Sequence, residues 1–116
     1  MSVVELKEVD RGVLQITLQD RENKNTFSPD LMRGLVDAFA HVEANPQYRV
    51  AIVTGYDTYF ASGGTKQGLH DIQQGKSKFS DINLYSLALD CKIPVISAMQ
   101  GHGIGGGFVF GMFADF

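Results

Sequence analysis

The sequence has no tryptophan, one cysteine and three prolines, and these scarcities exclude several classes of protein. The single thiol of Cys91 cannot form an internal disulfide, which excludes a disulfide-stapled scaffold. No apolar run approaches the ~20 residues of a membrane-spanning helix, and the first residues lack the basic and apolar blocks of a secretion signal. We therefore expect a cytoplasmic protein in which Cys91 is a small buried hydrophobic residue.

Neither sign of charge dominates, since 10 Lys and Arg face 13 Asp and Glu for a net charge of −3 at pH 7. The basic residues are scattered, unlike the concentrated basic surface of a nucleic-acid-binding protein. No His, Cys or carboxylate cluster has the spacing of metal ligands, so we predict no metal. With 116 residues, 44% of them hydrophobic, the chain can form one ordinary domain.

The first half of the chain predicts a hairpin followed by a helix. Apolar and polar residues alternate over Val3–Val9 and Val13–Gln19, and Asp10–Gly12 between them is a turn sequence. Ser28 has the character of a helix N-cap, and Pro29 suits the first helical position. The helix should end before the next proline, and its apolar residues recur at helical spacing: Leu31, Leu35, Ala38, Phe39 and Val42.

The second half predicts strands alternating with helices, and thus an α/β protein. Tyr48–Thr54 is apolar enough for a strand buried on both faces, and Ile93–Met99 predicts a second buried strand. Gln67–Ser80 is a polar loop sequence. Helical spacing marks Ile82–Leu89, and another helix should begin at the glycines of Gly105–Phe113.

Two glycine-rich stretches each follow a predicted strand. Tyr59–Lys66 reads Tyr-Phe-Ala-Ser-Gly-Gly-Thr-Lys, and Gln100–Phe108 reads Gln-Gly-His-Gly-Ile-Gly-Gly-Gly-Phe. Glycine leaves its backbone N–H accessible to a ligand. Two such N–H groups that converge on one carbonyl oxygen form an oxyanion hole, which stabilises negative charge on that oxygen.

The second stretch has two other interpretations. Gly101, Gly103 and Gly106 match the G-x-G-x-x-G fingerprint of a dinucleotide-binding turn, which also follows a strand and opens a helix. That fingerprint needs an acidic residue about 20 positions later, which the chain is too short to show. The glycines could also serve tight packing alone.

The two stretches together resemble the crotonase (enoyl-CoA hydratase/isomerase) superfamily. Phe60, Ala61 and Gly63 match the first motif of that family, while Ala98, Gly101 and the triple glycine from Gly105 match the second. The resemblance implies a crotonase fold, a spiral of ββα units, in which residues 1–116 form the N-terminal part of a single, truncated domain. It also implies a homotrimer or a pair of trimers.

The resemblance assigns site residues by position. The N–H groups of Gly64 and Gly106 would bind the oxygen of a thioester carried by CoA or by the phosphopantetheine of an acyl carrier protein, with Ala61 and Gly63 lining the site. The backbone of Asn25 and Thr26 would help to hold the CoA adenine. Asn25 as a simple turn residue is a second interpretation. No further cofactor is implied.

Two departures from the hydratase pattern bear on the chemistry. Val109 occupies the position of a hydratase glutamate, so water addition by the usual two-glutamate mechanism is not expected. Thr65-Lys66 replaces the aspartate expected after the first glycine pair. Lys66 could hold a substrate carboxylate or stabilise the enolate left when CO2 departs, and a solvated loop lysine is the alternative. The proton donor is expected beyond Phe116.

Tyr59–Lys66 and Asn83–Pro94 are similar to one branch in particular, the decarboxylases of polyketide β-branching. That resemblance implies conversion of a 3-methylglutaconyl-type thioester to a 3-methylcrotonyl type. An isomerase or hydrolase of the same fold and a non-catalytic acyl-carrier-binding scaffold are the alternatives. His41 and His70 are expected at the surface, whereas His102 could brace the glycine turn or face the thioester.

Overall fold

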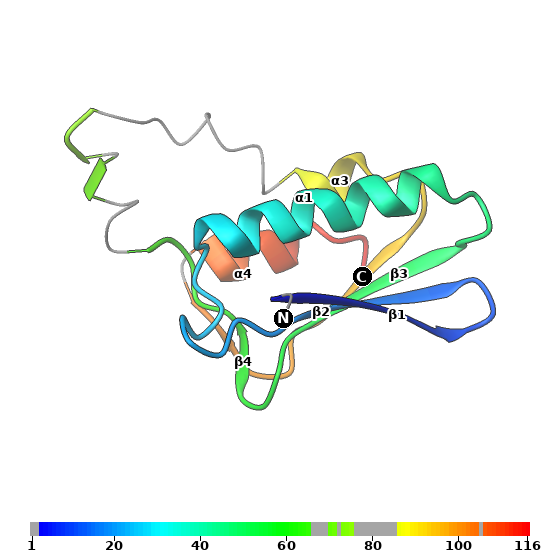
Figure 1. Ribbon diagram of the computed structural model, residues 1–116, viewed down its shortest axis with the longest axis horizontal. Coiled ribbons are helices and arrows are strands. Elements are labelled where there is room, and N and C mark those ends of the chain that lie inside the picture. The colour runs from blue at the N-terminus through cyan, green and yellow to red at the C-terminus, as the bar shows by residue number, and fades with distance from the viewer. Residues whose placement is uncertain (1–2, 66–69, 72, 76–85, 105) are drawn as a thin grey trace.

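The computed structural model describes residues 3–65, 70–71, 73–75, 86–104 and 106–116. Helix α1 lies along one face of a four-stranded sheet, which has the order β1-β2-β3-β5 (Figure 1). The strands of this sheet are β1 (Val4–Asp10), β2 (Val13–Leu18), β3 (Val50–Thr54) and β5 (Val95–Ala98). A second sheet pairs β4 (Tyr59–Ala61) with β6 (His102–Gly103). The helices are α1 (Pro29–Ala44), α3 (Leu87–Asp90) and α4 (Gly106–Met112).

The strand pairing confirms the predicted hairpin and the α/β class. β1 and β2 are antiparallel, from Val4 opposite Leu18 to Asp10 opposite Val13. β2 pairs with β3 and β3 with β5 in parallel, as expected where helices connect successive strands. None of the helices in the described part of the chain is long and apolar enough to cross a membrane.

Helix α1 forms as its sequence predicts. The side-chain oxygen of Ser28 accepts the N–H of Leu31 at 3.2 Å, Pro29 follows the cap, and Asn45 ends the helix. Its buried residues are the five predicted ones: Leu31, Leu35, Ala38, Phe39 and Val42. They join the apolar side chains of the main sheet in one core.

This burial makes Leu35 a test of the core. Leu35 is 0% exposed, whereas its neighbour Val36 on the same helix is 49% exposed. In the full-length protein, Leu35→Ala should lower the free energy of unfolding by about 2–5 kcal/mol, because it removes apolar contacts and leaves a cavity. Urea denaturation followed by circular dichroism measures the change, with Val36→Ala as the control. Equal small losses in the two variants would contradict this packing.

The described elements repeat two strands and a helix three times, as β1-β2-α1, β3-β4-α3 and β5-β6-α4. This is the ββα spiral that the resemblance implies. The second strands of the last two units, β4 and β6, leave the main sheet and pair with each other. They have three and two residues, which are too few for an alternating pattern, and both fall within the two glycine-rich stretches of the sequence.

The structure corrects three predictions. Only Ala51 and Val53 of β3 are buried, while the other three residues are partly exposed, so one face of this strand packs in the core rather than both. Cys91 is half-buried rather than buried, because it packs against the core beside a 250 Å³ hollow between α1 and α3. The last parallel strand, β5, covers Val95–Ala98 and is shorter than the predicted range Ile93–Met99. Most of Gln67–Ser80 and the first part of Ile82–Leu89 lie outside the described residues.

Candidate functional site

The two glycine-rich stretches lie side by side because β4 and β6 pair. Tyr59 lies opposite His102 and Ala61 opposite Gly103 in a parallel ladder. The chain therefore leaves both strands at the same end, where Gly63 and Gly64 follow β4 and the first turn of α4 follows β6. In α/β proteins, ligands bind at the carboxyl ends of parallel strands, and the two stretches meet at such an end.

The first turn of α4 sits directly on the end of β4. The N–H of Ile104 donates to the carbonyl of Ala61 at 3.0 Å, and a Cβ built on Gly107 would overlap that same carbonyl. Only glycine fits this approach of helix to strand. The N–H of Gly107 donates to Ile104 at 2.9 Å, whereas Gly106 opens the helix, where N–H groups have no intrahelical acceptor.

The direction of the Gly64 N–H follows from the pairing of its own peptide group with Phe27, which forms a parallel β-bridge with Gly64. The N–H of Phe27 donates to the carbonyl of Gly63 at 2.6 Å, and the φ of Gly63 is 80°, which favours glycine. The peptide between Gly63 and Gly64 is trans, so its C=O and N–H point in opposite directions. The N–H of Gly64 is thus turned away from Phe27.

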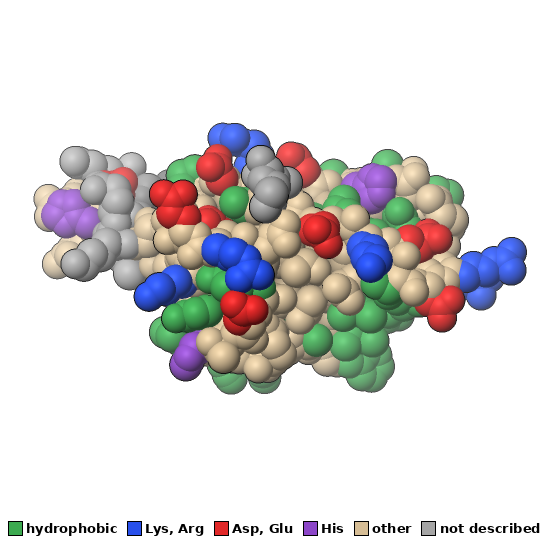
Figure 2. Space-filling model, turned by 60° about the horizontal axis from the view of Figure 1, so that its bottom comes forward, with side chains coloured by type: hydrophobic (Ala, Val, Ile, Leu, Met, Phe, Trp, Pro, Cys, Tyr) green, Lys and Arg blue, Asp and Glu red, His purple; other side chains and the backbone are tan. Residues whose placement is uncertain are grey.

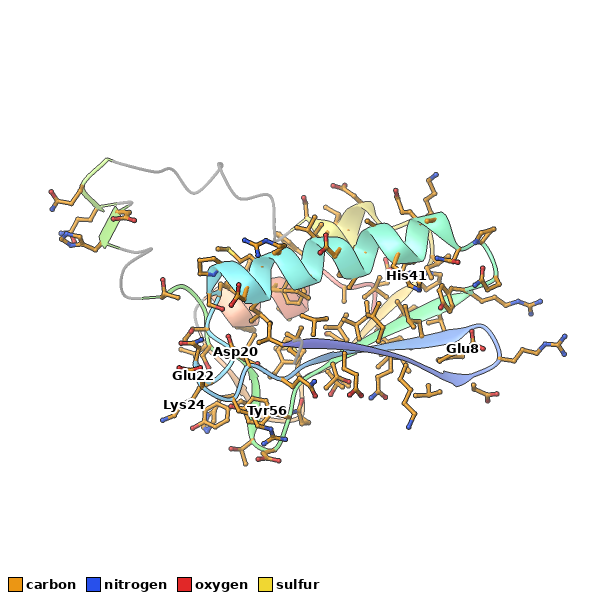
Figure 3. All side chains as sticks on the ribbon, in the orientation of Figure 1. Glu8, Asp20, Glu22, Lys24, His41 and Tyr56 are labelled. Atoms are coloured by element: carbon orange, nitrogen blue, oxygen red, sulfur yellow. The ribbon has the colours of Figure 1, made fainter. Side chains whose placement is uncertain are left out.

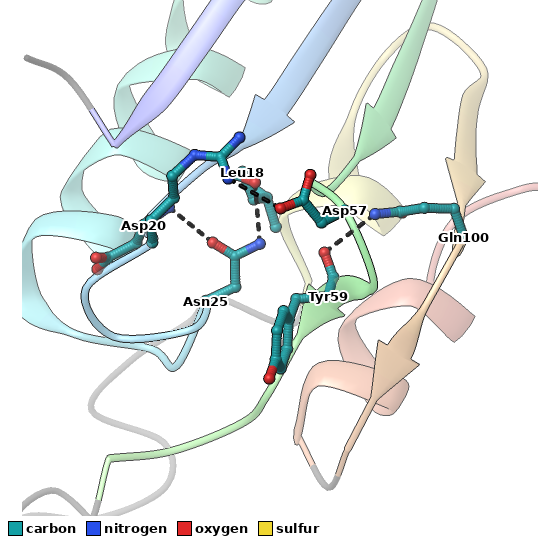
Figure 4. A network of polar contacts seen from close by, with 7 residues as sticks. Leu18, Asp20, Asn25, Asp57, Tyr59 and Gln100 are labelled. Carbon is teal, nitrogen blue, oxygen red and sulfur yellow. Dashed lines mark hydrogen bonds and ion pairs between the residues drawn. The ribbon is translucent and has the colours of Figure 1, made fainter.

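Asn25 lies at the centre of a buried polar network (Figure 4). Its side chain is 0% exposed, and its Nδ2 donates to the carbonyls of Leu18 at 2.9 Å and Phe60 at 2.8 Å. Its Oδ1 accepts the N–H of Asp20 at 2.8 Å, and its backbone carbonyl accepts that of Ser62 at 2.9 Å. With a φ of 56°, Asn25 is a turn residue whose side chain joins β2 to β4.

Asp20 completes this network, although nothing in the sequence marked it as a site residue. Asp20 is only 3% exposed. Its carboxylate accepts hydrogen bonds from the hydroxyl of Ser28 at 2.9 Å and from the Nδ2 of Asn23 at 3.0 Å. Because Ser28 also caps α1, the carboxylate ties the loop to the start of that helix. No local pattern marks an aspartate eight residues before a helix cap, so only the folded chain reveals this contact.

A second polar group surrounds the turn between β3 and β4. Arg21 pairs with Asp57 at 3.0 Å, and its guanidinium lies 4.5 Å from the ring centre of Tyr56. Desolvation, followed by the neighbouring Tyr59, raises the pKa of Tyr56 above its ordinary value of 10.0. Figure 3 shows Tyr56 at the same end of the molecule as Asp20.

Gln100 links this turn to the second glycine stretch. Its Nε2 donates to the carbonyl of Tyr59 at 3.1 Å, and its Oε1 accepts the N–H of Gly55 at 3.2 Å. The same Oε1 accepts the hydroxyl of Thr54 at 3.2 Å. One exposed side chain therefore holds the segment before β6 against both ends of the β3–β4 turn, a role that the sequence did not indicate.

The remaining predicted residues are placed as follows. Thr26 is half-buried, and its carbonyl accepts the N–H of Ser28 at 2.7 Å. Val109 on α4 is 44% exposed. Lys66 lies outside the described residues. In the part that the structure describes, no cluster of His, Cys and carboxylate side chains could hold a metal ion.

His41 and His70 are exposed, as predicted. His102 on β6 is also exposed, and its ring centre lies 5.3 Å from that of Tyr59. On the face that Figure 2 presents, basic and acidic side chains are interspersed rather than gathered by sign.

Comparison with known proteins places this geometry in a family. The model of the enoyl-CoA hydratase/isomerase family matches residues 8–116. The bacillaene synthase decarboxylase PksI of Bacillus subtilis is 62% identical over 114 residues, which are 98% of this chain and 46% of that protein. The carnitinyl-CoA dehydratase of Salmonella enteritidis is 33% identical over 109 residues, or 90% of this chain and 41% of that protein.

Solved structures agree with the sequence relatives. An enzyme of a dehydratase/decarboxylase couple involved in polyketide β-branching superposes with a TM-score of 0.97 at 61% identity, covering 99% of this chain and 47% of its own. The ECH2 decarboxylase domain of CurF from Lyngbya majuscula gives 0.92 at 46% identity, covering 100% of this chain and 47% of its own.

An enoyl-CoA hydratase from Bacillus anthracis shares the fold, with a TM-score of 0.80 at 20% identity over 98% of this chain and 46% of its own. The chain thus spans about half the length of the relatives it matches. It has the crotonase fold and belongs to the enoyl-CoA hydratase/isomerase family.

Proposed function

We propose that the full-length protein decarboxylates a carboxylated α,β-unsaturated acyl thioester of the 3-methylglutaconyl type in polyketide β-branching. The observation that carries this proposal is the 62% identity with a bacillaene synthase decarboxylase over 98% of this chain. Two superposed structures support the same reaction class: an enzyme of a dehydratase/decarboxylase couple involved in polyketide β-branching, and the ECH2 decarboxylase domain of CurF.

The proposed oxyanion hole consists of the N–H groups of Gly64 and Gly106. Two features support it: both glycines follow paired parallel strands at the same end, and the Gly64 N–H is turned away from the loop that holds its peptide. Bound to the thioester oxygen, each N–H would stabilise the charge that develops there. Loss of one such donor typically costs about 10²–10³-fold in rate.

The proposed reaction breaks one carbon–carbon bond. The carboxylate leaves as CO2, and the bonding electron pair passes through the double bond to the thioester oxygen as a dienolate. Addition of a proton to carbon then gives the 3-methylcrotonyl-type product. Lys66 would hold the substrate carboxylate until it departs, since an ammonium group offers both charge and hydrogen-bond donors.

The substrate would be carried by CoA or by the phosphopantetheine of an acyl carrier protein. In this proposal Ala61 and Gly63 line the site, and the half-buried Thr26 helps to hold a CoA adenine through its backbone. Asn25 supports that loop from within, because it is 0% exposed and its carbonyl accepts the N–H of Ser62. The enzyme would form a homotrimer or a pair of trimers, as the family resemblance implies. It would work in the cytoplasm, as the single cysteine suggests.

The proposed function is tested by incubating the full-length protein with the carboxylated thioester on each carrier in turn. Release of CO2 with formation of the decarboxylated thioester is the expected result, measured by mass spectrometry. Double-bond migration without loss of CO2 would instead indicate an isomerase. Binding without turnover would indicate a carrier-binding scaffold.

Val109 leads to a separate prediction about water addition. An aliphatic side chain cannot transfer a proton, so the full-length protein should not hydrate a crotonyl thioester faster than the uncatalysed reaction. The reaction is followed by the absorbance of the conjugated enoyl thioester. A hydratase of the same family is the positive control. Rapid hydration would show that another residue supplies the base.

A further inference from the structure

We propose that Asn25 is a positioning residue that sets the direction of the Gly64 N–H without contacting the reacting atoms. The proposal rests on the oxyanion role assigned to Gly64 above. Asn25 lies at the centre of the loop formed by residues 20–28, here called the anchor loop, and the segment that it holds is residues 60–64.

The anchor loop forms hydrogen bonds to Phe60, Ser62 and Gly63 of this segment. The Asn25 side chain donates to the carbonyl of Phe60 at 2.8 Å, and the Asn25 carbonyl accepts the N–H of Ser62 at 2.9 Å. The Ser62 hydroxyl donates to the carbonyl of Lys24 at 2.6 Å. Phe27 then donates to Gly63 at 2.6 Å. The last of these bonds orients the peptide that carries the Gly64 N–H.

The other contacts of Asn25 fix the anchor loop to the main sheet. Its Nδ2 also donates to the carbonyl of Leu18 at the end of β2, and its Oδ1 accepts the N–H of Asp20. β4 is not part of the main sheet, since it pairs only with β6 among the described strands. The buried amide is therefore a direct polar link from β2 to β4.

An asparagine suits this position for chemical reasons. Its planar amide group offers two N–H donors and one acceptor oxygen; both donors and the oxygen are used here. Aspartate would face the carbonyls of Leu18 and Phe60 with oxygens instead of donors. Alanine would leave three buried backbone groups without partners. The φ of 56° is also one that asparagine adopts more readily than most residues.

Asn25 would act through Gly64. An oxyanion donor works only when its nitrogen lies about 3 Å from the charged oxygen, so a tilted peptide loses most of its effect. If the anchor loop relaxes, the Gly63 carbonyl loses its fixed partner and the Gly64 N–H is free to turn. The thioester oxygen should then be bound less well, while other parts of the substrate are bound as before.

The test compares two unreactive ligands of the full-length protein, a pantetheine thioester analogue that keeps the carbonyl oxygen and a thioether in which a CH2 replaces the carbonyl. Asn25→Ala should weaken binding of the carbonyl ligand roughly 10- to 100-fold and leave the thioether within about twofold. Asn23→Ala is the matched control, because Asn23 lies in the same loop but contacts Asp20 rather than residues 60–64. Calorimetry gives both dissociation constants.

If Asn25→Ala lost the same affinity for both ligands, Asn25 would have a structural role only. If it lost no affinity for either ligand, Asn25 would have no role at the site. Either result overturns the proposal. Should Asn25→Ala not fold, Ser62→Ala removes only the exposed bond to Lys24, and the carbonyl ligand should bind roughly threefold more weakly. If the ratio of the two dissociation constants in Ser62→Ala equals that of the wild type, the proposal is overturned.

The two proposals fail separately. A wild-type protein that releases no CO2 but shows the Asn25-dependent carbonyl preference contradicts decarboxylation alone. A wild-type protein that decarboxylates, with Asn25 variants that keep its kcat and KM, contradicts the positioning role alone. Under the proposal, Asn25→Ala lowers kcat/KM by at least the factor by which it weakens binding of the carbonyl ligand.

Discussion

Replacing Gly107 with alanine in the full-length protein is expected to lower turnover of a carboxylated acyl thioester by about 100-fold or more. The added Cβ would overlap the carbonyl of Ala61 and approach the Ala61 Cβ to 2.9 Å. Backbone cannot move aside as a flexible side chain can. Helix α4 would have to shift away from β4, which separates the N–H of Gly106 from that of Gly64.

Gly111→Ala is the matched control, because it adds the same methyl group to the same helix. Its Cβ would meet the flexible end of Met99, whose sulfur lies at 2.6 Å, and a ring atom of Phe60 at 3.1 Å. We expect a much smaller loss of activity, since the Met99 side chain can change its conformation. CO2 release and the thermal midpoint should be measured on both. Full activity in Gly107→Ala would contradict the close approach of α4 to β4.

Lys66→Ala should lower decarboxylation by roughly 10- to 1000-fold, which corresponds to about 1.4–4 kcal/mol of barrier. The reason is the lost ammonium group, which we propose binds the departing carboxylate. Lys92→Ala provides the control, because Lys92 is an exposed lysine between α3 and β5. Single-turnover CO2 release by the full-length variants measures the effect.

Further measurements separate charge from general damage. A substrate analogue without the carboxylate should bind wild type and Lys66→Ala alike, because the lost contact involves only that group. Lys66→Arg keeps the charge with a different shape, so partial rescue would indicate electrostatic action and no rescue would indicate geometry. Full decarboxylation by Lys66→Ala would assign Lys66 to a solvated loop.

Elements with a long periodic pattern could be predicted from the sequence. The hairpin and helix α1 agree with prediction because alternation and helical spacing each extend over six or more residues, and Ser28 marks the helix start. The glycine motifs identified the family because their spacing is unusual. The prediction that β3 is buried on both faces was wrong, because its apolar composition resembles that of a strand covered on both faces.

The arrangement of the site could not be predicted in the same way. Pairing of Tyr59 with His102 joins residues far apart in the chain through strands too short to leave a pattern. The contacts of Asn25 depend on where β2 ends relative to β4, which is a tertiary property. The burial of the Asp20 carboxylate could not be predicted either, because an aspartate in a loop is usually solvated.

The short hydrogen bond between Phe27 and Gly63 has an electronic effect as well as a geometric one. A carbonyl that accepts a hydrogen bond draws electron density from its own peptide nitrogen, so the attached N–H becomes a stronger donor. Such cooperative polarisation strengthens a bond by about 10–30%. An oxygen bound at Gly64 would therefore be held by a relay of two peptide groups, and part of its negative charge would be shared with the backbone of Phe27.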